Sequence, residues 1–190
     1  MFLLVVLMLC IATVPLLGGR LGALAELHPR AGWLAMLAIA IQIVIISVIP
    51  GADSSVLQAA HLVSYALLGA FVFANRHIPG MALIALGGGS NVLVIAANDG
   101  VMPADPDLIA SAAVQKTDGE FLNSAVVQNP HLAFLGDSLA TPGWWPIHAL
   151  VSVGDCILIV GALVLLHVAC GSSLGRVAGR LRVLAPATAR

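Results

Sequence analysis

The stretch "GGGSNVLVIAANDGVMPADPD", from Gly87 to Asp107, decides how the chain is interpreted. Its first half is a glycine-rich apolar segment that carries one amide, Asn91, and ends at a second, Asn98. Its second half changes abruptly to aspartate and proline, which favour turns and end helices. Burying a polar group without a partner costs free energy. The two amides of this apolar helix therefore need partners, and finding them is the way to a candidate site.

Composition places the segment in a membrane. Of the 190 residues, 60% are hydrophobic and only 9% are charged, and the mean hydropathy is +1.05, unlike an average soluble domain. The formal net charge is -1 and no basic patch is present, so we exclude nucleic acid as a partner. Cys10, Cys156 and Cys170 lie far apart in apolar runs, without the spacing of a metal or redox site. We expect three buried thiols and no metal site.

Five segments are apolar over nearly the 20 residues that a helix needs to cross about 30 Å of hydrocarbon. They are residues 1–17, 32–49, 56–74, 78–97 and 147–169. The first segment has neither a positively charged start nor a clear cleavage site, so we interpret it as a retained helix rather than a signal peptide. The sequence therefore predicts an all-α integral membrane protein with five transmembrane helices.

The positive charges orient this bundle. Basic residues flank alternate ends of the predicted spans and leave Lys116 alone on the other side. The arginines on the first side are Arg20, Arg30, Arg76, Arg176, Arg180, Arg182 and Arg190. Because cytoplasmic loops carry the excess of Lys and Arg, we expect the N-terminus outside and the C-terminus in the cytoplasm. An even number of spans would place the basic tail opposite the other arginine loops, so five is the preferred count.

This topology predicts four regions. Residues 1–97 form a four-helix membrane region, 98–146 an extracytoplasmic cap segment, 147–170 the fifth helix and 171–190 a basic cytoplasmic tail. The cap segment is too long for a structureless loop. We expect two short helices in it, one in "PDLIASAAVQ" capped by Asp107 and one in "GEFLNSAVVQNP" ended by Pro130. Trp144 and Trp145 suit the headgroup boundary. The alternative is a surface loop that touches the outer leaflet.

Ionisable residues inside a span are costly, about 2.5–3.5 kcal/mol on the insertion scale, and face the protein interior. Asp155 is the clearest case, and the spacing i, i+4, i+7 places it with His148 and Ser152 on one stripe of a helix. Asn91 and Asn98 are likewise seven residues apart. We therefore predict a polar seam between the fourth and fifth spans, open toward the outside.

Small residues permit the two helices of this seam to approach. Gly87 and Gly88 precede Asn91 by one turn, as in small-residue interfaces between membrane helices. In the third span His61 and Tyr65 share a face and join the seam, and Gln42 comes from the second span. The alternative interpretation is structural, because such side chains often only hydrogen-bond their neighbours, for about 0.6 kcal/mol on average.

Four motifs, in this order, carry a resemblance. They are "SYALLGAFVFANR", "GMALIALGGGSNVLVIAANDGVMPA", "PHLAFLGD" and "VSVGDCILIVG", and together they resemble a family of small bacterial multi-span membrane proteins, frequent in actinobacteria and known as a domain of unknown function. The most specific string is Asn-x6-Asn-x-Gly-x-Met-Pro, which here is Asn91, Asn98, Gly100, Met102 and Pro103. The family more often has glycine at the position of Asp99, which weakens Asp99 as a site residue. The resemblance implies the architecture and a bacterial plasma-membrane location, and no activity.

A fainter resemblance is to lipoprotein signal peptidase, a four-span aspartic protease with an aspartate motif similar to "VGD" on its last span. It implies a carboxylate pair, Asp99 or Asp137 with Asp155, in which two close acids share one proton. The protease carries its other aspartate within "NxxDR", whereas the residues after Asn91 contain no acid at that place.

Three functions fit this sequence. The chain is an accessory subunit of a membrane complex, a ligand-binding or transport-related protein that uses the polar seam, or, as the alternative, an intramembrane aspartate-dependent hydrolase. The enzyme question stays open and leans toward no, because nucleophile-elbow, P-loop, HExxH and GxGxxG patterns are absent. The sequence assigns no cofactor. As partners we expect membrane lipid and either another membrane protein or further copies of this chain, since five spans make a small pathway alone.

Overall fold

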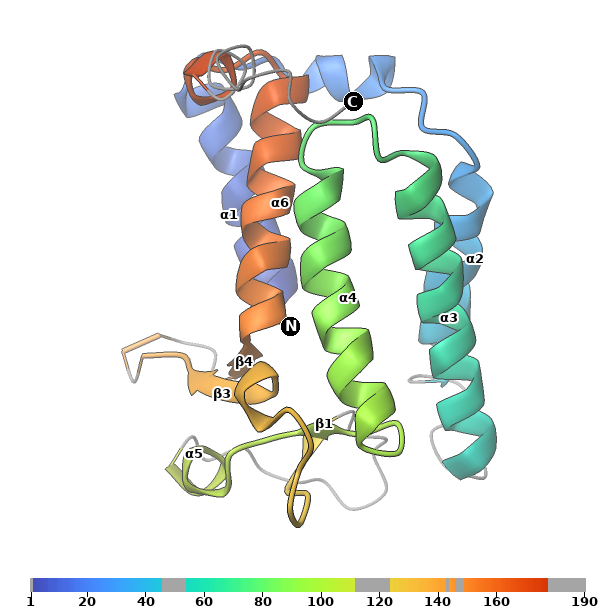
Figure 1. The fold of residues 1–190 in the computed structure, drawn as a ribbon. Coiled ribbons are helices and arrows are strands. Elements are labelled where there is room, and N and C mark those ends of the chain that lie inside the picture. The colour runs from blue at the N-terminus through green and yellow to red at the C-terminus, as the bar shows by residue number, and fades with distance from the viewer. Residues whose placement is uncertain (1, 46–53, 112–123, 143, 146–148, 178–190) are drawn as a thin grey trace, which may run out of the picture.

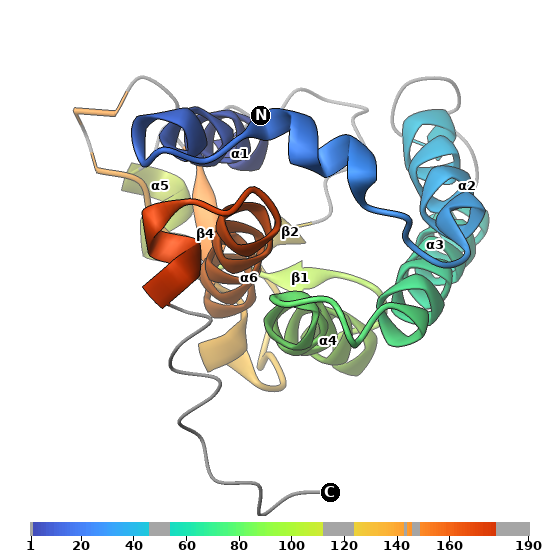
Figure 2. The same cartoon turned by 90° about the horizontal axis from the view of Figure 1, so that it is seen from above.

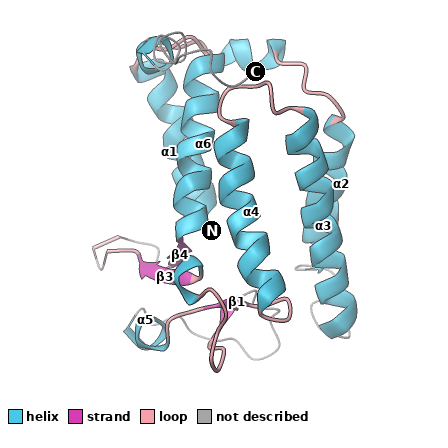
Figure 3. Cartoon of the chain, in the orientation of Figure 1, coloured by secondary structure: helices cyan, strands magenta, loops and turns pink. Residues whose placement is uncertain are grey.

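The computed structural model of the chain describes residues 2–45, 54–111, 124–142, 144–145 and 149–177 (Figure 1). The described chain is mostly helical, and its few strands gather at one end (Figure 3). Five apolar helices run alongside one another, and a short 3-10 helix, η1 (Leu21–Glu26), links the first two. The five are α1 (Phe2–Leu16), α2 (Gly32–Ile43), α3 (Ser54–Ala74), α4 (Met81–Ala97) and α6 (Val153–Ala169).

One described helix is long and apolar enough to cross a membrane. It is Ser55–Ala74 within α3, with a mean hydropathy of 1.7 over its best window, of which only 17% is buried inside the protein. The other four apolar helices have between 10 and 17 residues. The described residues thus support membrane association through one helix, and not the five membrane-spanning helices that the sequence predicts.

Most predicted helix boundaries hold to within a few residues. The first and third predicted spans, 1–17 and 56–74, correspond to α1 and α3. The fourth begins at Met81 rather than at residue 78, because Gly80 is its N-cap in a left-handed conformation with φ of 89°. The end of the second predicted span, residues 46–49, lies outside the described residues.

The predicted start of the fifth helix, at residue 147, is wrong. Residues Leu150–Ser152 form a strand, β4, and α6 begins at Val153. The cause is a capping box, in which the Ser152 hydroxyl accepts from the Asp155 backbone N–H and the Asp155 carboxylate accepts from the Ser152 N–H. The stripe of His148, Ser152 and Asp155 on one helix is therefore also wrong, and His148 itself lies outside the described residues.

The five helices form an open arc when viewed along their axes (Figure 2). Helix α6 lies between α1 and α4, and α3 lies between α4 and α2. Figure 2 shows α1 and α2 at the two ends of the arc, where η1 connects them at one end of the bundle. The arc places α4 and α6, the two helices of the predicted seam, at its centre.

Glycines bring α4 and α6 into close contact. A Cβ atom on Gly87 would lie 2.6 Å from the carbonyl oxygen of Gly154, and one on Gly161 would lie 2.9 Å from the backbone nitrogen of Ile84. Atoms do not approach so closely, so these positions require glycine. The predicted approach at Gly87 is confirmed, whereas a Cβ on Gly88 would make only an ordinary contact, 3.9 Å from Leu158. The α4–α6 pair is a small-residue helix interface.

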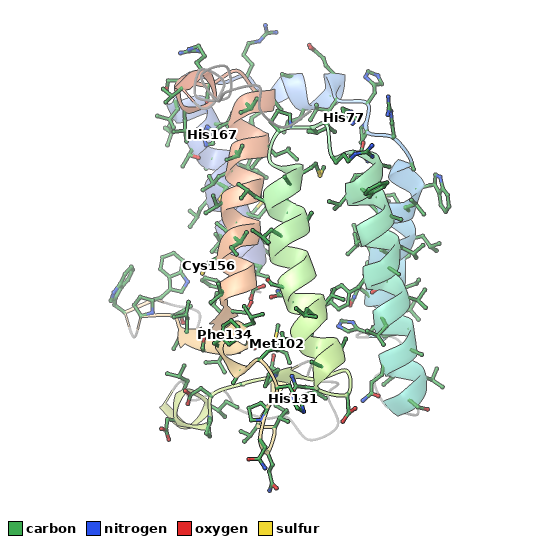
Figure 4. All side chains as sticks on the ribbon, in the orientation of Figure 1. His77, Met102, His131, Phe134, Cys156 and His167 are labelled. Carbon is green, nitrogen blue, oxygen red and sulfur yellow. The ribbon has the colours of Figure 1, made fainter. Side chains whose placement is uncertain are left out.

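Charged residues separate between the two ends of the bundle. At one end the backbone N–H of Arg20 donates to the Cys170 carbonyl, and the backbone of Arg30 bonds Asn75. We call this end, which also holds His77 and His167 (Figure 4), the arginine end. The opposite end carries Met102, His131 and Phe134 (Figure 4) and the described aspartates 99, 105, 107 and 137, and we call it the cap end.

Short elements build the cap. Strand β1 (Met102–Pro103) pairs in parallel with β2 (Ser124–Ala125). Strand β3 (Asp137–Ala140) pairs antiparallel with β4 and follows the 3-10 helix η3 (Ala133–Leu135). The short helix α5 (Pro106–Ser111) completes the cap. The cap therefore attaches to the bundle where α4 ends and where α6 begins.

The two predicted cap helices are corrected in part. The first exists as α5, but Asp105 caps it, since its Oδ1 accepts the backbone N–H of Asp107 at 2.9 Å. Asp107 lies inside the first turn instead. The second predicted helix falls partly on residues 119–123, outside the described residues, and the described remainder begins with strand β2 and contains no helix.

The expectation of three buried cysteines is wrong for Cys156. Cys10 and Cys170 are buried in one apolar cluster between α1 and α6, whereas Cys156 is exposed. Successive residues of a helix are rotated by about 100°. Because Asp155 faces α4, its neighbour Cys156 faces away from it.

Candidate functional site

In the predicted seam, Asp155 contacts Asn91 and not Asn98. The Asn91 Nδ2 donates to Asp155 Oδ1 at 2.9 Å, and the Ser152 hydroxyl donates to Asn91 Oδ1 at 3.0 Å. The backbone N–H of Ser152 donates to Asp155 Oδ2 at 3.2 Å, and that of Asp155 donates to Ser152 Oγ at 3.0 Å. We call these three residues the polar junction.

Burial and backbone geometry explain why the polar junction forms. Ser152 is fully buried, Asn91 is 8% exposed and Asp155 is partly buried. A side chain at Gly154 would collide with the Asn91 amide oxygen, so glycine there admits the amide between the helices. Each polar atom of the Asn91 and Asp155 side chains has a partner within the junction. The junction holds α4 against the first turn of α6.

Asn98 is hydrogen-bonded to a different part of the chain, the cap. Its Oδ1 accepts the backbone N–H of His131 at 2.9 Å, and its Nδ2 donates to the His131 carbonyl at 2.9 Å and to the Val94 carbonyl at 2.7 Å. The amide thus pairs with the backbone of the cap as a neighbouring strand would. The two amides of α4 have separate tasks, because Asn91 binds α6 and Asn98 binds the cap.

Asn75 repeats this arrangement at the arginine end, and the sequence interpretation missed it. Its Oδ1 accepts the Arg30 N–H, and its Nδ2 donates to the carbonyls of Arg30 and Phe71, all at 2.8 Å. Asn75 is fully buried. The available signal was its position, since Asn75 and Asn98 each directly follow the last residue of an apolar helix.

Of the candidate acids, Asp137 lies near the polar junction. It is 7% exposed, is the register partner of Ser152 across β3 and β4, and accepts the Ser124 hydroxyl at Oδ2 at 2.6 Å. Burial raises the pKa of Asp137, the Ser124 hydrogen bond lowers it, and the charge of Asp155 raises it further. The carboxyl groups of Asp137 and Asp155 therefore interact. Asp99 is exposed in a left-handed turn with φ of 55°.

His61 and Tyr65 belong to another set of contacts. The Gln42 amide donates to His61 Nδ1 at 3.0 Å and to the Ser64 hydroxyl at 2.6 Å, which joins α2 to α3. The rings of His61 and Tyr65 meet edge to face with centroids 4.5 Å apart, and Tyr65 packs against the apolar cluster of Val94, Ile95 and Met102 on the α4 side. These residues connect α2, α3 and α4.

His167 is a second buried polar residue that the sequence interpretation missed. It is 1% exposed in the last turn of α6. Its Nε2 lies 3.0 Å from the Thr13 hydroxyl and its Nδ1 lies 2.8 Å from the Ser172 hydroxyl. Thr13 already donates to the Cys10 carbonyl, so it accepts the Nε2 proton. These bonds hold α1 to α6. Within the described residues no group of three His, Cys, Asp or Glu side chains is placed to hold a metal ion.

Comparison with known proteins gives a family. A model described as "Family of unknown function (DUF5317)" matches residues 26–167, from the end of η1 to the last turn of α6. An "Uncharacterized protein" of Thermotoga maritima is 28% identical over 102 residues, which are 53% of this chain and 58% of that protein. The match thus covers little more than half of either chain. No solved structure matches.

Proposed function

The chain belongs to the family of unknown function DUF5317, and we propose from its geometry that it is an accessory subunit of a membrane-protein complex. In this proposal all five apolar helices cross the bacterial plasma membrane, with the arginine end in the cytoplasm and the cap outside. The separation of arginines from aspartates between the two ends supports the orientation.

One observation supports a non-catalytic role for the chain. Among the residues that the sequence offered for a site, Asn91, Ser152 and Asp155 are hydrogen-bonded to one another, and Asn98 is hydrogen-bonded to the backbone of the cap and of α4. The Asp155 carboxylate, the Asn91 amide and the Ser152 hydroxyl form one closed set of hydrogen bonds. A catalytic group must meet substrate, and a general base needs a free position toward it. A closed set favours assembly of helices instead.

The apolar helix faces supply the surface for a partner. The leucine-rich side of α1 is exposed at one end of the arc, and α2 likewise exposes apolar residues at the other. On α1 these include Leu3, Leu4, Leu7 and Met8. Helices associate in membranes through van der Waals packing of such faces, so we propose that a transmembrane helix of the partner packs against α1.

The test is the composition of the particle extracted from native membranes with a membrane-solubilising polymer. The accessory role predicts one reproducible partner protein in fixed stoichiometry, lost when Leu4 and Met8 are both replaced by tryptophan on α1. Replacing Leu86 by tryptophan is the matched control, since Leu86 is an exposed apolar residue of α4. A particle that contains this chain alone in both cases contradicts the proposal.

Two variants of Asp155 separate assembly from a binding or transport role. Asp155→Asn keeps an oxygen for the Ser152 N–H, and a rotated Asn91 amide restores the remaining bonds, so folding and partner association stay intact. Asp155→Leu leaves the Asn91 donor unpaired and lowers stability by about 1–3 kcal/mol. If Asp155→Asn folds and keeps its partner but loses a bound ligand, the junction is a ligand site and the binding role is favoured over the accessory role.

The aspartate-dependent hydrolase remains as a second candidate because of one observation. Asp137 is the register partner of Ser152, whose backbone N–H donates to Asp155 Oδ2, and two close acids are able to share a proton, one as acid and one as base. Such a pair requires both carboxyls. Retention of the cellular phenotype of the wild type by both Asp137→Asn and Asp155→Asn would exclude it, and loss in both folded variants would favour it.

A further inference from the structure

The β3–β4 hairpin lies beside α4 rather than beyond its end. Asp137 on β3 is the register partner of Ser152 on β4, and Ser152 bonds Asn91 of α4. Asn91 precedes Asn98 in the chain by two helical turns, about 10 Å along the axis at 1.5 Å per residue. Figure 1 shows the same offset, because β3 and β4 lie level with the side of α4 and not below its last turn.

The hairpin is apolar at its connection. Residues 138–145, "SLATPGWW", contain no charge. Trp144 is 77% exposed and Leu139 is 46% exposed, and Trp145 lies edge-on to Trp144 with ring centroids 5.6 Å apart. Helix α5, which carries the acids Asp105 and Asp107 before and in its first turn, lies farther from the bundle (Figure 1). The acidic start of α5 thus lies farther from the helix bundle than the hairpin does.

The remaining tryptophan marks the opposite boundary. Trp33 is the second residue of α2, at the arginine end, and is 66% exposed. Tryptophan concentrates at the headgroup level of both membrane surfaces, because its ring is apolar and its N–H is polar. Helix α6 has 17 residues, about 25 Å, which is close to the thickness of the hydrocarbon layer.

We infer that the β3–β4 hairpin is an interfacial anchor that places Trp144 in the headgroup layer of the outer leaflet. The inference rests on the proposed membrane-spanning bundle. The anchor binds the lipid surface itself, without selectivity for headgroup charge, because residues 138–145 carry no charge. In water, Trp144 and Leu139 would expose apolar area without compensation.

Backbone hydrogen bonding fixes how deep the hairpin lies. Strand edges do not enter hydrocarbon, because their N–H and C=O groups have no partner there. Near the connection Thr141 N–H donates to the Ala149 carbonyl and Ala149 N–H donates to the Thr141 hydroxyl. These bonds suit the headgroup layer, which still contains water. The outer boundary then passes at the level of the polar junction, and the last two turns of α4, with Asn98, project beyond it into the cap.

Tryptophan fluorescence in lipid nanodiscs tests the anchor. The variant Trp33→Phe/Trp145→Phe retains Trp144 alone, and Trp144→Phe/Trp145→Phe retains Trp33 as the matched control. The probes are phosphatidylcholine brominated near the headgroup end of its acyl chain, the same lipid brominated near its methyl end, and aqueous acrylamide. We expect shallow bromine to remove most of the Trp144 emission, deep bromine to remove less, and acrylamide to remove little.

Each outcome of the quenching experiment either supports the anchor or overturns it. If acrylamide quenches Trp144 and shallow bromine does not, the hairpin lies in water and the anchor is wrong; quenching by neither reagent means that Trp144 packs against protein, which also overturns it. If brominated lipid quenches Trp33 but not Trp144, only the anchor is rejected. If brominated lipid quenches neither tryptophan, the membrane bundle is rejected as well. Should the double variants fail to fold, the difference in emission between wild type and Trp144→Phe gives the same comparison.

Discussion

At the scale of single residues, two asparagines hold the outlying segments to the helices with the same three hydrogen bonds. Asn98 and Asn75 each accept one backbone N–H, donate to the carbonyl of that same residue, and donate to a carbonyl one turn back in their own helix. An amide is the smallest side chain with both a donor and an acceptor in this geometry. Each asparagine therefore substitutes for a strand neighbour at a helix end.

The Asn98→Asp variant tests this function at the cap end. A carboxylate still accepts the His131 N–H but faces the His131 and Val94 carbonyls without a proton, so we expect a loss of roughly 1–3 kcal/mol and faster proteolysis of the cap. Asn75→Asp is the matched control. It should loosen the arginine end by a similar amount while the rate of cap proteolysis stays that of wild type. Equal cap proteolysis in both variants would contradict the local role of Asn98.

Asp137 gives the cap a pH dependence. Burial and the neighbouring Asp155 raise its folded-state pKa above the ordinary value of 3.8. For a carboxyl with a raised pKa, the stabilising contribution is fully present below the unfolded pKa and is lost as pH rises through the folded pKa. We therefore expect Asp137→Asn to gain stability relative to wild type as pH rises through that window. Unfolding free energies of both proteins measured across this window provide the check, and a constant difference between them would contradict the pH dependence assigned to Asp137.

At the scale of elements, glycine spacing controls the α4–α6 contact. A Cβ on Gly87 would lie 2.6 Å from the Gly154 oxygen and 2.8 Å from the Leu158 nitrogen, both backbone atoms that move only with their helix. We expect Gly87→Ala to cost about 1–3 kcal/mol through overpacking. Gly89→Ala meets nothing within 4 Å and should be neutral or gain up to about 1 kcal/mol from helix propensity. Denaturant unfolding in detergent micelles measures both, and equal effects would mean that α4 and α6 are not in close contact.

Hydropathy predicted the apolar helices better than their ends. The fifth span illustrates why. Leu150 and Val151, which precede α6, are as apolar as the helix but lie in strand β4, so polarity does not mark where the helix begins. The signal for the start of α6 was the Ser152-x-x-Asp155 spacing of a capping box. A span argument based only on apolar length overlooks such a local hydrogen bond.

At the scale of the whole molecule, the sequence predicted which residues are buried more readily than which ones meet. The free-energy cost of a carboxylate in an apolar helix predicted that Asp155 meets an asparagine of the fourth span, and the structure shows that this asparagine is Asn91. The pairing of Asn98 with His131, and of Asp137 with Ser152, depends on how the cap folds back. That path is set by many weak tertiary contacts and by no periodicity, so a single sequence does not reveal it.

The proposed topology makes the last prediction, which concerns the two faces of the membrane. Glu26 in η1 and Asp107 in α5 are both exposed and lie at the arginine end and the cap end, respectively. In a Cys156→Ser background, which removes the exposed native thiol, an impermeant maleimide should label Asp107→Cys on intact cells and label Glu26→Cys only after permeabilisation. The reason is the positive-inside rule, which keeps the arginine loops in the cytoplasm. Labelling of both cysteines on intact cells would mean that no membrane separates the two ends, and the reverse pattern would invert the orientation while leaving the bundle in the membrane.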